Sequence, residues 1–207
     1  MEECRIALAK GRLLKESIPL LERAGLEMVA NPNDDRRLIL NSKDKNIEFV
    51  ILRAADVVTY VEYGAADLGI VGKDMLMEED SRGIYELYDL GIGKCRLSVA
   101  GLPSPQKLKY RPRVATKYCL SARRYFAQCN KQVGIIKLYG SMEMAPILGL
   151  ADLIVDLVDS GKTLAANGLQ EFETIKDISA RLIANRTAMK IKDRTVKNLV
   201  EQITNVC

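Results

Sequence analysis

Histidine is absent from this 207-residue chain, and so is tryptophan. Without histidine there can be no serine–histidine catalytic triad, no histidine general base and no histidine metal ligand. Any chemistry must therefore use carboxylates, lysines, arginines, hydroxyl groups or backbone amides. The five cysteines are scattered and contain no Cys-x-x-Cys pair, which indicates reduced thiols and argues against a zinc site.

Long apolar runs are missing as well. No stretch reaches the length of a membrane span, and the first residues, MEECRIALAKGRLL, contain early acids and no apolar signal-peptide core. We therefore expect a cytoplasmic protein without a membrane partner. The net charge of +4 is modest and the basic residues are spread along the chain, so we expect no nucleic acid partner and favour a small anionic ligand.

The sequence does contain an alternation of strand-like and helix-like segments, which is typical of an α/β protein. With 48% hydrophobic residues, the chain can bury a substantial core. We predict strands at 4–9, 37–41, 47–52, 67–71, 95–101, 112–116, 133–138, 152–157 and 173–184, and helices at 12–24, 54–63, 73–79, 120–129, 142–149, 162–167 and 188–205.

Two interruptions of this alternation suggest a division into lobes. The pattern relaxes near Gly91-Ile92-Gly93 and again after Leu169, and the residues between them form a self-contained α/β set. We predict a second lobe, residues 91–174, inserted into a first lobe made of residues 1–90 and 175–207. Two chain crossings of this kind leave a central cleft that can close on a ligand.

The segment IVDLVDSGKTLAANGL, residues 154–169, contains the Gly-Lys-Thr tail of a nucleotide-binding P-loop. A P-loop needs a glycine five positions before Gly161, where this chain has Asp156, so that interpretation fails. What remains is a strand, a tight loop and a helix start, where free amides favour an anion. On these residues alone, an ordinary strand-to-helix turn capped by Ser160 is the simpler interpretation.

Cationic residues follow the strands of the first lobe. Lys10-Gly11-Arg12 occupies a strand-to-helix turn, and Arg53 follows the buried strand IEFVIL. A guanidinium group at the end of a strand can bind phosphate through two hydrogen bonds. Arg36, at the start of another strand, can do the same. Lys10 and Arg12 can equally be solvated turn residues, and Arg53 can equally form an ion pair with Asp56 or Glu62.

Two further segments leave alternatives open. In YGAADLGIVGKDML, a buried strand lies between Asp67 and Gly72, and Gly72 permits a close approach of a ligand to the backbone, although a plain strand-turn-helix link fits equally. Glu143 can cap its own helix or, with Asp156 and the Ser160 loop, accept hydrogen bonds from a sugar diol.

Three motifs, ALAKGRL, AADVVTYVEYGAADLGIVGKDML and EMAPILGLADLIVDLVDSGKTLAANGL, occur in an order and spacing that resemble the ATP phosphoribosyltransferase family of histidine biosynthesis. The resemblance runs nearly end to end. It implies the two-lobed fold of type II periplasmic binding proteins. It also implies transfer of the phosphoribosyl group of 5-phosphoribosyl 1-pyrophosphate (PRPP) to N1 of the adenine of ATP, with Mg²⁺ accompanying the released pyrophosphate.

The chain's length resembles the family's short form, which lacks a regulatory domain. The resemblance therefore implies a hetero-oligomer with a regulatory subunit similar to a histidyl-tRNA synthetase, and a dimer of catalytic chains.

The resemblance also implies roles for individual residues. Catalytic roles at the phosphates of ATP or the leaving pyrophosphate fall to Arg36 and Arg53. The ATP side is assigned Lys10, Gly11, Arg12, Asp67 and Gly72. The PRPP side is assigned Glu143, Asp156, Asp159, Ser160, Gly161, Lys162, Thr163 and Leu164. The family's usual threonine is Ser160 here, which keeps the hydroxyl, and Lys162 replaces a smaller residue and adds a positive charge.

Two other classes compete with this interpretation. A two-lobed domain that binds or senses a small anion without catalysis would use AADLGIVG equally well, and the sugar-phosphate loop is what separates the two. A single-lobed phosphoribosyltransferase usually has two adjacent acids before its loop, whereas Asp152, Asp156 and Asp159 are separated in this chain.

Overall fold

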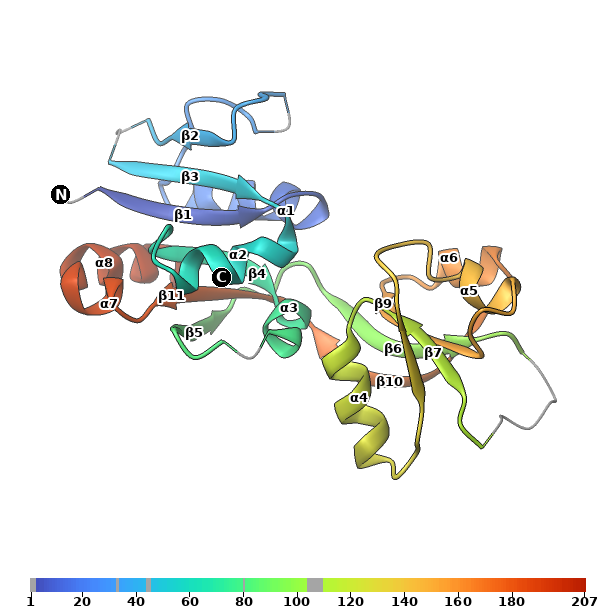
Figure 1. Cartoon of the computed structure of the whole chain (residues 1–207). Coiled ribbons are helices and arrows are strands. Elements are labelled where there is room, and N and C mark those ends of the chain that lie inside the picture. Colours follow the sequence, from blue (N-terminus) through green and yellow to red (C-terminus); the bar gives the residue numbers. More distant parts are fainter. Residues whose placement is uncertain (1–2, 33, 44–45, 80, 104–109) are drawn as a thin grey trace. The chain divides into compact units, whose positions relative to one another are not determined.

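The computed structural model describes residues 3–32, 34–43, 46–79, 81–103 and 110–207 (Figure 1). The chain forms two compact α/β units, Met1–Gly93 with Ser179–Cys207 and, inserted between them in sequence, Lys94–Ile178. The sequence predicts that the chain passes between the two units at 90/91 and 174/175. In the structure it does so slightly later, after Gly93 and after Ile178. The carboxylate of Glu16 accepts a hydrogen bond from the N–H of Gly93 over 2.7 Å. This bond holds the last residue before the inserted unit to α1 (Arg12–Arg23) of the first unit.

The first unit is built on a six-stranded sheet in the order β2-β3-β1-β4-β11-β5. β3, β1 and β4 are parallel neighbours. The strands are β1 (Cys4–Ala9), β2 (Ile39–Asn41), β3 (Ile47–Leu52), β4 (Leu68–Gly72), β5 (Ile84–Asp89) and β11 (Ala180–Asn185). The helices are α1 (Arg12–Arg23), α2 (Ala54–Glu62), α3 (Lys73–Glu78), α7 (Ala188–Ile191) and α8 (Asp193–Thr204).

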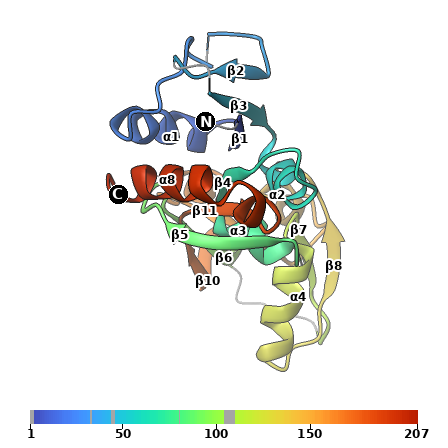
Figure 2. The same ribbon diagram turned by 90° about the vertical axis from the view of Figure 1, so that its left-hand side faces the viewer.

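Helices cover both faces of this sheet, and α1 and α8 lie on the same side (Figure 2). Alternate residues of β1, including Ile6 and Leu8, pack in one core cluster with Leu20 of α1 and Leu199 of α8. The opposite face meets α2, where a Cβ on Gly69 would lie 2.8 Å from Val61. Because both faces of the sheet are covered, β1 and β3 are mostly apolar and contain one charged residue each, Arg5 and Glu48, which made both strands easy to predict.

The inserted unit is built on a five-stranded sheet in the order β10-β6-β9-β7-β8. β8, β7 and β9 run parallel, and β6 is antiparallel to β9 and to β10. The strands are β6 (Cys95–Gly101), β7 (Arg113–Thr116), β8 (Gly134–Lys137), β9 (Leu153–Val158) and β10 (Gln170–Ile178), and the helices are α4 (Cys119–Gln128), α5 (Met144–Ile147) and α6 (Lys162–Ala166).

Two predicted elements differ from the structure, and one strand was not predicted. The single strand predicted at 173–184 is wrong, because Ser179 separates β10 of one sheet from β11 of the other. The helix predicted at 188–205 is divided between α7 and α8 at Lys192, whose φ of −104° and ψ of 33° leave the helical region. β5 was not predicted, because its sequence IYELYD lacks the apolar alternation of a half-buried strand and its residues are half-buried or exposed.

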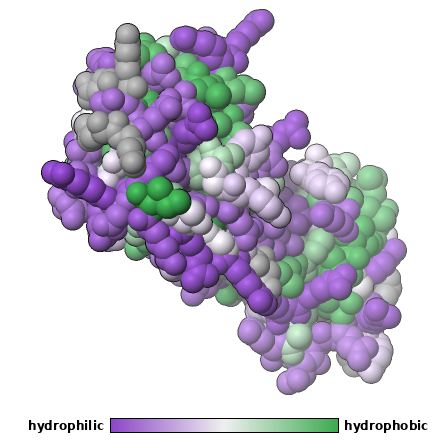
Figure 3. Space-filling model, turned by 60° about the vertical axis from the view of Figure 1, so that its left-hand side comes forward, coloured by the Kyte–Doolittle hydropathy of each residue, from purple (hydrophilic) through white to green (hydrophobic). Residues whose placement is uncertain are grey.

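Hydrophilic side chains cover most of the face shown in Figure 3, with smaller apolar areas between them. Scattered apolar surface of this kind is normal for folded proteins. None of the helices in the described ranges has both the length and the apolar character needed to span a membrane.

Candidate functional site

A pocket of ≈ 230 Å³ lies in the inserted unit where β9 ends and α6 begins. Its lining includes all eight residues that the family resemblance assigned to the sugar phosphate, namely Glu143, Asp156, Asp159, Ser160, Gly161, Lys162, Thr163 and Leu164. The structure therefore brings that predicted set together at one place.

Strand pairing explains the floor of this pocket. Along β9, Ile154, Asp156 and Val158 project to one face because side chains alternate in a strand. Ser98 of β6 pairs directly with Asp156, and Ala100 pairs with Ile154, so their side chains share that face. All five residues line the pocket.

Gly161 lets the chain turn from β9 into α6. Its φ of 74° and ψ of 0° are left-handed, a conformation that glycine adopts without the steric cost of a Cβ. Gly161 is the N-cap of α6, and the hydroxyl of Ser160 lies 3.5 Å from the N–H of Lys162, at the outer limit of a hydrogen bond. The capping role first considered for Ser160 is therefore weak, and the loop is shaped by the glycine.

Two half-buried acids stand beside this loop. Oδ1 of Asp156 accepts the N–H of Leu157 over 2.8 Å, which fixes the side chain against its own strand. Glu143 directly precedes α5, and the backbone enters that turn through Ser141, whose φ is 50°. Carboxylate oxygens in such positions can accept hydrogen bonds from hydroxyl groups.

In the first unit, four predicted residues gather at the carboxyl ends of parallel strands. The N–H of Lys10 donates to the carbonyl oxygen of Leu52 over 2.7 Å, which extends the pairing of β1 with β3 and places Lys10 beside the residue that follows Leu52, Arg53. Gly11 has a φ of 93°, which requires glycine. Arg12 opens α1 and pairs through its Nε with Glu16 over 2.9 Å.

The two catalytic candidates have exposed side chains. Arg53 is the N-cap of α2, and within the described residues it forms no ion pair with Asp56 or Glu62. The carboxylate of Glu62 instead accepts the N–H groups of Arg82 and Gly83. Arg36 precedes β2, which is antiparallel to β3 and next to it, so a continuation of this pairing would bring Arg36 toward Arg53.

Gly72 ends β4 at the same edge of the sheet, but its neighbour Asp74 already explains the glycine. A Cβ on Gly72 would lie 2.1 Å from Oδ1 of Asp74. The space that Gly72 leaves for Asp74 agrees with the plain strand-turn-helix link considered for this segment, and contact of Gly72 with ATP stays a prediction.

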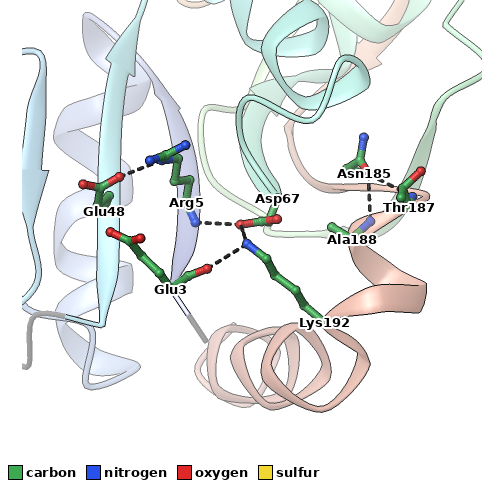
Figure 4. Close-up of polar contacts among 8 residues, drawn as sticks. All are labelled: Glu3, Arg5, Glu48, Asp67, Asn185, Thr187, Ala188 and Lys192. Carbon is green, nitrogen blue, oxygen red and sulfur yellow. Dashed lines mark hydrogen bonds and ion pairs between the residues drawn. The ribbon is translucent and has the colours of Figure 1, made fainter. Parts of the chain in front are cut away.

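Asp67 does not join the other residues predicted for the nucleotide. It precedes β4 and so lies at the opposite end of the parallel strands, 7% exposed. Its Oδ2 accepts the N–H of Arg5 and a proton of the Lys192 ammonium, each over 2.9 Å (Figure 4). The same ammonium donates to the carbonyl oxygen of Glu3 over 2.7 Å. The grouping of Asp67 with Lys10 is therefore corrected: the structure gives Asp67 a role in holding β1, β4 and the start of α8 together.

Sequence reasoning missed residues of β6 and β10 that adjoin the pocket. Ser98 is fully buried, lines the pocket and donates its hydroxyl proton to Glu171 over 2.7 Å. Ser98 lies in a segment predicted only as a strand, and Glu171 lies between the helix predicted at 162–167 and the strand predicted at 173–184. The pairing of β6 between β9 and β10, which the sequence alone does not show, is what brings them to the site.

Comparisons with known proteins show the family to which the chain belongs. Residues 53–205 match the family model described as ATP phosphoribosyltransferase. An ATP phosphoribosyltransferase of Methylococcus capsulatus is 52% identical over 201 residues, which cover 97% of this chain and 94% of the relative.

Solved structures are similar as well. The ATP phosphoribosyltransferase (HisG:HisZ) complex of Thermotoga maritima contains a chain that superposes with a TM-score of 0.85 at 30% identity, covering 98% of both chains. The periplasmic aliphatic sulphonate binding protein SsuA of Escherichia coli superposes with a TM-score of 0.64 at 15% identity, covering 100% of this chain and 68% of SsuA. The predicted two-lobed fold of periplasmic binding proteins is thereby confirmed.

Proposed function

The chain belongs to the ATP phosphoribosyltransferase family, and from this premise we propose which of its residues carry out the first step of histidine biosynthesis. In that reaction, N1 of the adenine of ATP attacks the anomeric carbon of the ribose of PRPP. The bond from that carbon to the pyrophosphate oxygen breaks, and pyrophosphate leaves.

The observation that carries the proposal is the pocket in which the eight predicted residues meet. We assign the loop from Asp159 to Leu164 to the 5-phosphate of PRPP, because successive backbone N–H groups in a turn form a concavity that suits an anion. We assign Asp156 and Glu143 to the ribose hydroxyls. The pocket's volume of ≈ 230 Å³ is below the roughly 300–1,000 Å³ of pockets for drug-sized ligands, as expected if it holds only the sugar phosphate part of PRPP.

The reaction needs no general base to begin, because N1 of adenine carries a lone pair and pyrophosphate leaves as an anion. A chain without histidine is therefore equipped for it. The transition state gathers positive charge on the ribose and negative charge on the pyrophosphate, so carboxylates near the sugar and arginines at the leaving group lower the barrier. We propose Arg53 and Arg36 for the leaving group, and Lys10, Gly11 and Arg12 for ATP.

Magnesium fits this chemistry as a companion of the pyrophosphate. No group of three or more histidine, cysteine, aspartate or glutamate side chains suited to a metal occurs among the described residues. Mg²⁺ is commonly held by one or two carboxylates together with substrate phosphates, and two carboxylates, those of Glu143 and Asp156, line the pocket. When bound, Mg²⁺ would neutralise charge on the phosphate oxygens.

A regulatory partner is also part of the proposal. The solved relative from Thermotoga maritima is a HisG:HisZ complex, which supports a hetero-oligomer of a pair of these chains with a subunit similar to a histidyl-tRNA synthetase. We place the reaction in the cytoplasm, where ATP is supplied.

Product formation tests the proposal. The chain, mixed with ATP, PRPP and Mg²⁺ with and without a regulatory subunit, should form a compound with the absorbance of an N1-substituted adenine and release one pyrophosphate per product molecule. Binding of PRPP without product under both conditions would contradict the proposal and favour a domain that only binds or senses its ligand.

A further inference from the structure

Four polar residues beside the pocket have no part in the reaction proposed above. They are Arg96 and Ser98 on β6 and Glu171 and Thr174 on β10, and we call them the brace. Arg96 pairs with Val158 of β9, so its side chain projects from the same face of the sheet as the pocket floor. The brace therefore adjoins the site through the sheet that carries it.

Glu171 is the centre of the brace. Nε and Nη2 of Arg96 donate to its two carboxylate oxygens over 2.6 and 2.5 Å. The hydroxyl groups of Ser98 and Thr174 donate to the same carboxylate over 2.7 and 3.2 Å. The Arg96 and Glu171 side chains are 33% and 22% exposed, so a two-point contact fixes the guanidinium in a partly sheltered position.

Charge keeps this contact in place. The paired guanidinium of Arg96 is the largest cause that lowers the pKa of Glu171 to about 2. The hydroxyl groups of Ser98 and Thr174 act in the same direction. Glu171 is therefore ionised at neutral pH, and its negative charge beside a site for an anion is balanced by Arg96.

The remaining donor of Arg96 reaches the loop itself. Its Nη1 donates to the backbone carbonyl oxygen of Asp159 over 2.9 Å. Asp159 is the first residue after β9, and its carbonyl belongs to the same planar peptide as the N–H of Ser160. In a trans peptide these two groups point in opposite directions, so fixing the oxygen toward Arg96 turns the first amide of the loop away from Arg96.

We infer that Arg96, oriented by Glu171, is a positioning residue that holds the phosphate loop in the conformation that binds the 5-phosphate of PRPP. The inference rests on the function proposed for that loop. Arg96 acts through the backbone of Asp159 and does not need to touch the substrate. Because the loop grips a part of PRPP that does not react, its loss should weaken substrate and transition state alike, which raises KM and leaves kcat nearly unchanged.

Calorimetry with ribose 5-phosphate, together with steady-state kinetics for PRPP and ATP, tests the inference on the full chain. Arg96→Met should weaken ribose 5-phosphate binding and raise the KM for PRPP by about tenfold or more, since a hydrogen bond from a charged donor is lost. The KM for ATP should stay within about twofold. Arg96→Lys should give an intermediate effect, because one ammonium cannot make both the two-point contact and the loop contact.

The double variant Arg96→Met/Glu171→Gln separates position from charge. Arg96→Met alone leaves an uncompensated carboxylate that could repel the phosphate, whereas the double variant removes that charge too. If Arg96 positions the loop, the double variant should bind ribose 5-phosphate as weakly as Arg96→Met. Recovery of the parent's affinity would overturn the inference, as would unchanged affinity in Arg96→Met.

Arg113→Met is the matched control. Arg113 lies in the same unit and also joins a carboxylate, that of Asp152, with a backbone carbonyl, that of Gly149 over 2.8 Å, but it contacts no residue of the loop among those described. The Arg113→Met variant should bind ribose 5-phosphate with the same affinity as the parent. If Arg96→Met does not fold, Arg96→Lys decides the matter, and unchanged affinity there overturns the inference.

The proposed reaction and the brace can fail separately. Product formation by the parent tests the reaction, whereas the ratio of ribose 5-phosphate affinities tests the brace. A parent that binds ribose 5-phosphate but forms no product would refute only the reaction. A parent that forms product but does not bind ribose 5-phosphate at millimolar concentration would refute only the brace.

Discussion

The left-handed backbone conformation of Gly161 shapes the loop that we propose for phosphate binding. A φ of 74° costs an ordinary residue about 1–2 kcal/mol, and the turn that it makes carries the loop from β9 to α6. The space around it is open, because a Cβ would meet only Val158, at 3.9 Å. The glycine is therefore required by the backbone and not by crowding, and replacing it should change the loop without disturbing the core.

Gly161→Val should abolish measurable PRPP binding while the chain remains folded. The β-branched side chain is incompatible with the left-handed conformation, so the loop amides should move from their positions, and the free energy of unfolding should fall by only about 1–3 kcal/mol. Calorimetry and urea unfolding measure the two effects.

Gly168→Val provides the control for backbone strain. Gly168 follows α6 with a φ of 70° and open space around it, so the two substitutions should cost similar stability. Gly168→Val should nevertheless retain PRPP binding. Normal binding by Gly161→Val, or equal loss in both variants, would remove the loop from the site.

Arg53→Ala should lower kcat by about a hundredfold or more while the KM for PRPP changes by less than about threefold. The reason is that a guanidinium at the leaving pyrophosphate interacts most strongly with the charge that develops in the transition state. Steady-state kinetics measure both constants, and Arg194→Ala, an exposed arginine of α8, serves as the control. An unchanged kcat would remove Arg53 from catalysis.

The charge of Glu171 gives a prediction about pH. Its pKa is lowered from 4.5 to about 2 in the folded chain, so the stability that this ionisation contributes is complete above about pH 4.5 and is lost as the pH falls toward 2. Glu171→Gln cannot titrate. The parent's free energy of unfolding minus that of the variant should therefore be larger at pH 6 than at pH 2.5. We expect this increase to be roughly 1–2 kcal/mol after allowance for solvent screening.

Urea unfolding of both proteins across this pH range measures that difference. A gap in stability that does not change with pH would show that Glu171 is not held as an ion by Arg96.

At the scale of elements, buried strands and strand-end loops could be predicted, and pairings between distant strands could not. The predicted bounds 4–9 and 47–52 coincide with β1 and β3, because apolar residues dominate both segments. Seven of the eight residues predicted for the pocket lie between 156 and 164, so a local pattern was enough to group them. The brace depends on the antiparallel pairing of β10 with β6, and the residue pattern of neither strand indicates which strand it pairs with.

The direction of β4 separates Asp67 from the residues at the other end of the strand. This residue precedes its strand and Gly72 ends it, so the two lie at opposite edges of the sheet. The error at 173–184 has a different cause, because β10 and β11 are both extended and only their membership of different sheets separates them.

Asp67→Asn should lower the free energy of unfolding by about 1–3 kcal/mol, because Lys192 loses its buried charged partner. The KM for ATP should stay within about twofold. Chemical unfolding and kinetics test the two statements, with Asp56→Asn, an exposed acid of α2, as the control. A large rise in the KM for ATP at unchanged stability would restore Asp67 to the nucleotide side.

At the scale of the whole molecule, the proposal assigns the two substrates to two units of one chain. The inserted unit carries the pocket for the sugar phosphate, and the first unit carries the cations at the carboxyl ends of β1 and β3. The fold is shared with a sulphonate-binding protein at 15% identity, so the fold alone does not give the reaction. Family membership gives the reaction, and the residues at the strand ends give its proposed mechanism.

A crystal structure of this chain with PRPP and Mg²⁺ would show which residues hold the sugar phosphate. We expect the 5-phosphate to accept hydrogen bonds from backbone N–H groups between Ser160 and Leu164, and Asp156 and Glu143 to accept hydrogen bonds from the ribose hydroxyls. A 5-phosphate bound elsewhere, with this loop empty, would refute the role proposed for the loop.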